Sequence, residues 1–220
     1  MIYYISFFVF INLYLILSNI YKSRIFLYPV LFFAFVFSAL RYDAGYDYFS
    51  YLNIIITEEG LQRLEYFNRL IIELSNYLNF PQLYFIITSF LFILFMTLGF
   101  KQFKQFNYVT VYLMLFFIGS YITSFDIVRQ MVSVSILFYA ISLFINKGYF
   151  SSIIFFLIAV NFHKASLIFI PIVLFLIIIN SKEFKTWLYI VLVFMSIYLI
   201  DIFIVLSEIT GLYTHYFITG

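Results

Sequence analysis

The sequence predicts an all-α, polytopic integral membrane protein with about eight transmembrane helices and an extracytoplasmic interfacial amphipathic helix. Of its 220 residues, 65% are hydrophobic and only 10% are charged, whereas soluble domains have about 45–50% apolar and about 25% charged residues. Long unbroken apolar runs recur along the chain, unlike the alternating pattern of a membrane β-barrel. Basic residues also gather in alternate connections between these runs.

The apolar runs give the predicted spans. A membrane-spanning helix needs about 20 apolar residues, with about 17–25 as the usual range. Eight runs approach this length: 2–21, 25–40, 83–100, 107–123, 127–146, 149–162, 165–180 and 186–206. The second and sixth are short, and the stretch 149–180 could be one broken pair around "FHKAS". Because no internal repeat or flexible linker is visible, residues 1–220 are interpreted as a single membrane domain.

The charges between the runs predict a sidedness. One alternating set of connections carries many cations and a single acid: Lys22, Arg24, Lys101, Lys104, Lys147, Lys182, Lys185 and Glu183. The other set is richer in acids: Asp43, Asp47, Glu58, Glu59, Glu65, Glu73, Asp126 and Glu208, with Arg41, Arg63, Arg69, Arg129 and Lys164. Short loops rich in Lys and Arg stay in the cytoplasm. The second set and both termini are therefore predicted to be extracytoplasmic.

The longest connection, residues 41–82, contains a predicted amphipathic helix. In "LQRLEYFNRLIIELSNYL" apolar residues recur at helical spacing: Leu61, Leu64, Phe67, Ile71, Leu74 and Leu78. Glu65, Arg69 and Glu73 follow at i, i+4 on another face, where such pairs support a helix weakly. This pattern predicts a helix that lies in the outer interface and does not cross the membrane.

The first of three polar clusters on this predicted outer side is "RYDAGYDYFSY", which follows the second span. Gly45 permits a turn, and Asp47 is placed to cap a helix over residues 48–56. In the simpler interpretation the cluster only finishes a membrane helix, with a snorkelling arginine, a tyrosine belt and capping aspartates. Two acids and a cation within seven positions exceed what that role requires.

The second cluster, "SFDIVRQMVSVS", stands at the start of a span. Asp126 and Arg129 are spaced i, i+3, and Gln130 and Ser133 extend the polarity one turn further. The pair could simply neutralise its own charge near lipid. An arginine with acid and amide neighbours close to a membrane is nevertheless a functional candidate.

The third cluster, "NFHKASLIFIP", places His163 and Lys164 in an otherwise apolar stretch. Imidazole is the side chain best suited to proton transfer near neutral pH. A single histidine is more often a packing residue than a catalyst. The weight of the functional interpretation comes from the coincidence of three clusters on one predicted side.

In this order, "RYDAGYDYFSY", "FDIVRQ" and "FHKAS" with Pro171 resemble the EpsG-like family of Wzy-type polysaccharide polymerases, over residues 40–171. The resemblance implies a multi-pass enzyme of the bacterial inner membrane with its active face extracytoplasmic. Such an enzyme joins undecaprenyl-diphosphate-linked oligosaccharide repeat units during exopolysaccharide, capsule or O-antigen biosynthesis. Members generally continue through further membrane helices, which leaves open that this chain is C-terminally truncated and inactive alone.

The chemistry implied by this resemblance suggests roles for the polar residues. Planar guanidinium groups bind a leaving diphosphate through paired hydrogen bonds, which favours Arg41 and Arg129. The attacking sugar hydroxyl needs a base, and the alternatives stay open: His163, Asp43, Asp47 or Asp126. A sugar groove could be lined by Tyr42, Tyr46, Tyr48, Tyr51 and Gln130.

The expected partners are the lipid-linked oligosaccharide substrate and membrane lipid, with a flippase and chain-length regulator proteins as further candidates. No nucleic acid is expected at a net charge of +2. No cofactor and no metal are expected, since neither a nucleotide-binding glycine loop nor a convincing ligand set is present. Alternatives are a glycosyltransferase using a polyprenyl-phosphate sugar, or a transporter or flippase. Only Asp201 lies well inside a predicted span, which disfavours a translocation path.

Overall fold

The structure, a computed structural model, describes residues 2–102, 113, 116–117, 119–168 and 170. The chain divides into two units, Met1–Ile170 and Pro171–Gly220, and all described residues belong to the first. Several predictions fall outside the described residues: the span 186–206, most of the spans 165–180 and 107–123, and the positions Lys104, Pro171 and Asp201. The expectation of one domain over residues 1–220 stays a prediction.

All regular secondary structure among the described residues is helical, without strands, as predicted. Five of the predicted spans are confirmed as helices: α1 (Ile2–Ile20), α2 (Leu27–Ala39), α5 (Gln82–Lys101), α8 (Val128–Ile145) and α9 (Tyr149–Phe162). By length and composition α5 and α8 can cross a membrane. The part Tyr4–Ile20 of α1, and the helices α2 and α9, are apolar but shorter. The number of eight spans stays a prediction.

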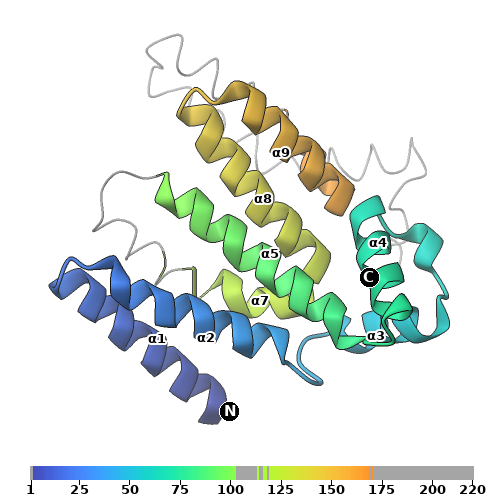
Figure 1. Ribbon diagram of the computed structural model, residues 1–220, viewed down its shortest axis with the longest axis horizontal. Helices are drawn as coiled ribbons and strands as arrows, with labels where there is room; N and C mark the ends of the chain where they lie inside the picture. The colour runs from blue at the N-terminus through green and yellow to red at the C-terminus, as the bar shows by residue number, and fades with distance from the viewer. Residues whose placement is uncertain (1, 103–112, 114–115, 118, 169, 171–220) are drawn as a thin grey trace, which may run out of the picture. The chain divides into compact units, whose positions relative to one another are not determined.

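The helices α1, α2, α5, α8 and α9 lie side by side in that order (Figure 1). Helices α5 and α8 run in the same direction, and α2 and α9 run opposite to them. Hydroxyl groups contribute to the contacts between neighbours. Ser38 of α2 and Ser89 of α5 share a hydrogen bond of 2.7 Å, and Ser152 of α9 donates to the Ala140 carbonyl of α8 at 2.8 Å. Interhelical hydrogen bonds and close packing stabilise helix pairs in apolar surroundings.

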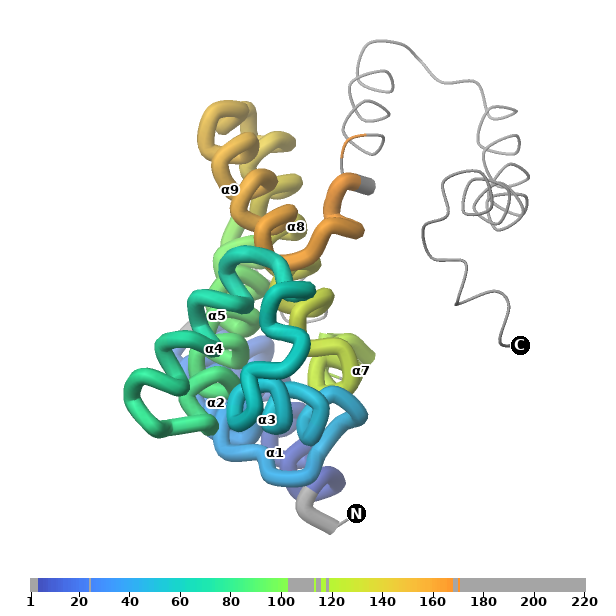
Figure 2. The backbone as a smooth tube through the Cα atoms, turned by 90° about the vertical axis from the view of Figure 1, so that its right-hand side faces the viewer, coloured from blue at the N-terminus to red at the C-terminus, as the bar shows by residue number. Residues whose placement is uncertain are grey.

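The connection 41–82 forms two short helices, in the two stretches where the sequence predicts them. Helix α3 (Asp47–Thr57) follows the polar loop, and α4 (Tyr66–Tyr77) comes after a single 3₁₀ turn, Leu61–Arg63. Helices α3 and α4 lie together at one end of the longer helices, the end that faces the viewer in Figure 2. Helix α4 packs on α3, α5 and α9. These contacts bury only part of the predicted apolar stripe. The buried residues of α4 are Asn68, Ile71, Ile72 and Ser75, whereas Leu74 and Leu78 are exposed.

A single residue separates helix α7 (Ser120–Asp126) from α8. The intervening Ile127 has φ −129° and ψ 61°, which lies outside the helical region. Asp126 and Arg129 therefore do not share one face of a continuous helix. The interpretation of these two residues as an i, i+3 ion pair is wrong, because Arg129 pairs with a carboxylate from another element.

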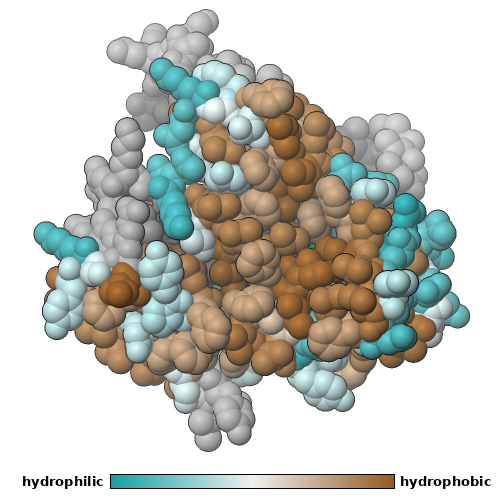
Figure 3. Space-filling model, viewed as in Figure 1, coloured by the Kyte–Doolittle hydropathy of each residue, from teal (hydrophilic) through white to brown (hydrophobic). Residues whose placement is uncertain are grey.

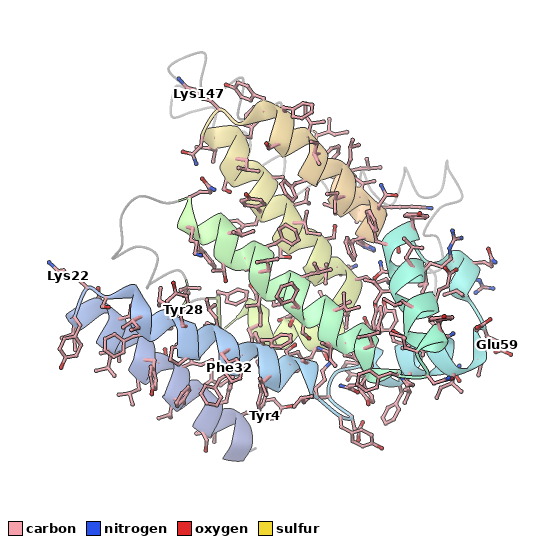
Figure 4. The ribbon with its side chains drawn as sticks, in the orientation of Figure 1. Tyr4, Lys22, Tyr28, Phe32, Glu59 and Lys147 are labelled. Carbon is pink, nitrogen blue, oxygen red and sulfur yellow. The ribbon has the colours of Figure 1, made fainter. Side chains whose placement is uncertain are left out.

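Described members of the two charge sets lie at opposite ends of the helices. Lys22 and Lys147 lie at one end and Glu59 at the other (Figure 4). Between the ends, Figure 3 shows a broad hydrophobic surface, to which α2 contributes the exposed side chains of Tyr28 and Phe32. A large exposed apolar surface between two polar ends is typical of contact with lipid.

Candidate functional site

The polar loop after α2 binds the junction between α7 and α8. The Asp126 carboxylate (Oδ1) accepts a hydrogen bond from the Tyr46 N–H at 3.1 Å, and Asp47 Oδ2 accepts one from the Val128 N–H at 3.2 Å. Tyr46 precedes α3 and Val128 opens α8, so each carboxylate binds an N–H group at the start of a helix. Such N–H groups have no intrahelical partner and favour negative charge.

The role of Asp47 differs from the predicted one. A helix does begin at this position, but Asp47 is its first residue and α3 has no side-chain cap. The carboxylate instead binds the first N–H group of α8, 81 residues further along the chain. Asp47 therefore joins the first polar cluster to the second. Burial raises the pKa of this carboxylate, opposed by the Val128 N–H and by the charges of Arg129 and Arg41.

Gly45 makes this approach possible. Its φ of +89° belongs to the region that favours glycine, as the predicted turn requires. A Cβ at this position would also lie 2.1 Å from the Phe125 carbonyl oxygen and 3.0 Å from the Asp126 nitrogen. The glycine is thus needed both for the turn and for the contact between the two clusters.

Arg41 is buried between two aromatic rings. The residue is only 6% exposed, and its Cζ lies 4.9 Å from the ring centroids of both Phe85 and Phe125. Burial lowers the pKa of Arg41 to about 10, so the guanidinium stays charged at neutral pH. Nε and Nη2 are buried without a hydrogen-bond partner among the described residues.

Two hollows adjoin Arg41. A cavity of about 10 Å³, the room of about one water molecule, is lined by Arg41 and by hydroxyl groups, those of Ser38, Thr88, Ser89 and Ser124 among them. Arg41 also lines an open groove of about 410 Å³ that is mostly apolar. Its lining residues are Tyr4, Val36, Phe37, Leu40, Arg41, Tyr42, Ala44 and Phe125. A buried cation therefore lies beneath a groove whose walls suit an apolar chain.

The second and third polar clusters meet at Glu65. Its Oε2 lies 2.8 Å from Arg129 Nη1, and its Oε1 lies 3.2 Å from His163 Nδ1. The Lys164 backbone N–H also donates to Oε1, at 3.4 Å. One carboxylate thus links the start of α8, the end of α9 and the start of α4.

Sequence reasoning missed Glu65 as a site residue. The spacing favoured an i, i+4 contact with Arg69, but α4 begins only at Tyr66, and Glu65 precedes it with φ −65° and ψ 156°. The other predicted i, i+4 pair is confirmed, with Arg69 3.6 Å from Glu73. No local signal could have found the site, because Glu65 is 64 residues from Arg129 and 98 from His163 along the chain.

The Glu65 carboxylate is a stable anion in this position. Its side chain is only 9% exposed. Burial alone would raise its pKa, but the hydrogen bonds from His163 and from its own backbone N–H, together with the charge of Arg129, lower the pKa to about 2. Hydrogen bonds to the charged form and a nearby cation thus outweigh the loss of solvation.

A buried amide fixes the end of α9 just before His163. Asn68 of α4 is fully buried, and its Nδ2 donates to the Phe162 carbonyl at 2.6 Å. The Tyr84 hydroxyl donates to Asn68 Oδ1 at 3.3 Å. These bonds satisfy a carbonyl at the end of the helix, which has no intrahelical partner, and hold His163 beside Glu65.

The four tyrosines of the first cluster separate into two pairs. Tyr42 and Tyr46 are exposed by 77% and 91%. Tyr48 and Tyr51 are buried, and their rings stack on aromatic rings of α5 at centroid distances of 4.7 and 4.8 Å. In this arrangement only Tyr42 and Tyr46 offer ring surface to a sugar.

Asp43 and Gln130 are both exposed. Asp43 has φ +48° and occupies the same tight loop as Gly45. Neither residue joins the contacts around Glu65 that the structure describes. Within the described ranges, no three His, Asp or Glu side chains are grouped so that they could hold a metal ion.

Two of the described helices are long and apolar enough to cross a membrane, and a charged network lies at one end of the helices, as in helical membrane proteins. The chain is a member of the EpsG family, whose sequence model matches residues 24–220. This confirms the resemblance and places the chain among membrane proteins of polysaccharide biosynthesis. No curated protein and no solved structure matches the chain.

Proposed function

We propose that this protein is a polysaccharide polymerase that joins lipid-diphosphate-linked oligosaccharide units at the outer face of the inner membrane. The observation that carries the proposal is the contact of Arg129 and His163 with one buried carboxylate, that of Glu65. The contact brings together a cation for the leaving group and a base for the nucleophile. Both lie at the acidic end of the helices, which the charge distribution predicts to be extracytoplasmic.

In the proposed reaction, a hydroxyl oxygen of one lipid-linked unit forms a bond to the anomeric carbon of the growing glycan. The bond from that carbon to the diphosphate oxygen breaks, and the diphosphate leaves with the electron pair. The hydroxyl proton passes to Nε2 of His163, acting as general base. The products are the glycan lengthened by one unit, the free lipid diphosphate and the protonated imidazole.

Arg129 is the first candidate to bind the leaving diphosphate. Its side chain is 29% exposed, and one of its nitrogens already binds Glu65. The guanidinium presents several further donors in a plane, which suits phosphate oxygens. Arg41 is too buried for a broad direct contact. We propose that Arg41 acts at a distance, through its electrostatic field. Its positive charge beside the apolar groove favours a diphosphate whose lipid chain occupies the groove.

The exposed Tyr42 and Tyr46 fit a role in holding the sugar. Aromatic faces with a polar tip suit a pyranose ring. Asp47 and Asp126 are engaged with backbone N–H groups, which leaves His163 as the preferred base. Asp43 stays the second choice, because it is exposed.

The distribution of charge supports surface chemistry over transport. Helices α1, α2 and α9 contain no charged residue, and the single charges of α5 and α8 lie in a terminal turn. A translocation path would place ionisable groups deep within these helices. The alternative function, a transferase that adds single sugars, can be distinguished from a polymerase by its product. Such an enzyme would extend its acceptor by one sugar and not by whole repeat units.

The test is His163→Gln, which keeps hydrogen bonding but loses basicity. General bases contribute about 10²–10⁴-fold in rate, so single repeat units should accumulate on their lipid carrier while their binding to purified protein survives. Asn161→Ala, at an exposed position two residues earlier, is the control. Near-normal polymerisation by His163→Gln would show that His163 is a packing residue and not the base. Loss of binding would make it a ligand contact and move the base to an aspartate.

A further inference from the structure

The Glu65 carboxylate receives hydrogen bonds from three sides. Arg129 Nη1 approaches one oxygen, and His163 Nδ1 and the Lys164 N–H approach the other. An ionised carboxylate only accepts hydrogen bonds, and both arginine and a backbone N–H only donate them. The His163 nitrogen that faces this carboxylate must therefore carry a proton.

We propose that Glu65 is a positioning residue that holds His163 in the tautomer protonated on Nδ1, so that the Nε2 lone pair faces the substrate. This inference rests on the proposed function, in which His163 is the base. Free histidine favours the opposite tautomer, with the proton on Nε2, which could not accept a proton there. A carboxylate bonded to Nδ1–H fixes both the ring orientation and the reactive nitrogen.

The other contacts of Glu65 make it suited to this role. Its oxygens are divided between Arg129 and His163, so the proposed diphosphate-binding cation and the proposed base are held at a fixed separation. The carboxylate is largely buried and anchored at the start of α4, whose Asn68 also binds the end of α9. Preorganisation of this kind lowers the cost of reaching the reactive geometry.

The substitution Glu65→Gln gives a sharp test. Arg129 offers only donors, and its bond to the carboxylate at 2.8 Å is much shorter than that of the Lys164 N–H at 3.4 Å. The amide oxygen of the new side chain should therefore turn to Arg129, and its NH₂ group should face His163 Nδ1. Nδ1 would then become an acceptor, and the proton would move to Nε2. A merely structural role for Glu65 predicts no such exchange of protons between the ring nitrogens.

The tautomer is read directly by NMR of protein labelled with ¹⁵N in the histidine rings. The chain contains two histidines, and His215→Gln assigns the signals of His163. At alkaline pH the wild type should show a protonated Nδ1 and a bare Nε2, and Glu65→Gln should show the reverse. Glu73→Gln, which changes a carboxylate on an exposed face of α4, should leave the His163 signals unchanged. A wild-type ring protonated on Nε2 would overturn the inference even if Glu65→Gln failed to fold.

Polymerisation measured on the same proteins separates the two proposals. Glu65→Gln should slow polymer formation by about 10²–10⁴-fold with binding of lipid-linked units retained, and Glu73→Gln should behave as the wild type. If the tautomers exchange but the wild type forms no polymer, the proposed function fails and the positioning of His163 stands. If the wild type polymerises and Glu65→Gln keeps the wild-type tautomer and rate, the positioning role is refuted and the function stands.

Discussion

Asp47 binds the N-terminus of a helix that lies 81 residues away in the sequence: its carboxylate accepts the Val128 N–H at 3.2 Å. The neighbouring bond from the Tyr46 N–H to Asp126 runs in the opposite sense. Together they place Arg129, one residue after Val128, on a junction fixed by backbone contacts. Two of the acidic residues thus build the site without needing to take part in the chemistry.

This relationship predicts a difference between two substitutions at Asp47. Asparagine keeps an oxygen that can accept the Val128 N–H, so Asp47→Asn should keep most polymer formation. Asp47→Ala leaves a partly buried N–H group without its partner, which costs about 1–3 kcal/mol of stability. Polymer length and the thermal midpoint of the purified protein measure the two effects. Loss of polymer by a stable Asp47→Asn protein would instead make Asp47 the base.

Gly45 and Gly60 allow a matched test of the contact between the first two clusters. Both have positive φ, +89° and +81°, but an added Cβ at Gly60 meets nothing within 4 Å, whereas at Gly45 it would overlap the Phe125 carbonyl. Gly60→Ala should cost only the backbone strain, about 1–2 kcal/mol. Gly45→Ala should cost clearly more and should lower the amount of folded protein in the membrane. Equal thermal midpoints for the two variants would show that the loop can move away from α7.

Arg129 should act through the geometry of its guanidinium. Lysine keeps the charge but cannot make paired hydrogen bonds to a diphosphate, so Arg129→Lys should abolish most polymer while protein levels stay normal. Arg69→Lys is the control, because Arg69 pairs with Glu73 on an exposed face at 3.6 Å, where ion pairs contribute little. If Arg129→Lys makes polymer of normal length, Arg129 does not bind the diphosphate through paired hydrogen bonds and serves only to hold Glu65 in place.

Glu65 should make the free energy of unfolding depend on pH in the acidic range. Its pKa is lowered from 4.5 to about 2, so its ionised form stabilises the folded state fully above about pH 4.5. That contribution is lost as the pH falls from 4.5 towards 2. Glu65→Gln should therefore be less stable than the wild type near neutral pH, by on the order of 3 kcal/mol. Thermal midpoints across this range should converge at low pH, and parallel curves would contradict the assignment.

The sidedness of the membrane can be tested because the sequence contains no cysteine. Glu59 and Lys147 lie at opposite ends of the helices (Figure 4). In intact cells without an outer-membrane barrier, an impermeant thiol reagent should label Glu59→Cys but not Lys147→Cys. Labelling both variants after permeabilisation is the control. The reverse pattern would place the Glu65 network in the cytoplasm and exclude polymerisation at the outer face.

The sequence alone determined the helical class, most helix boundaries and the family. Apolar runs are local signals, and α2 (Leu27–Ala39) and α9 (Tyr149–Phe162) begin and end within two residues of their predicted limits. The separation of basic and acidic connections is also local, since it needs only the order of the spans. Arg129 and His163 stood out because polar groups beside apolar runs are costly without a function.

Only the tertiary structure decided how these residues meet. The break at Ile127 turned Arg129 away from Asp126 and towards Glu65, which sequence spacing had assigned to a surface ion pair. The burial of Tyr48 and Tyr51, and of Arg41 between two rings, likewise follows from packing against α5 and α7. These contacts join residues tens of positions apart. Their free energy depends on desolvation and geometry that no local pattern encodes.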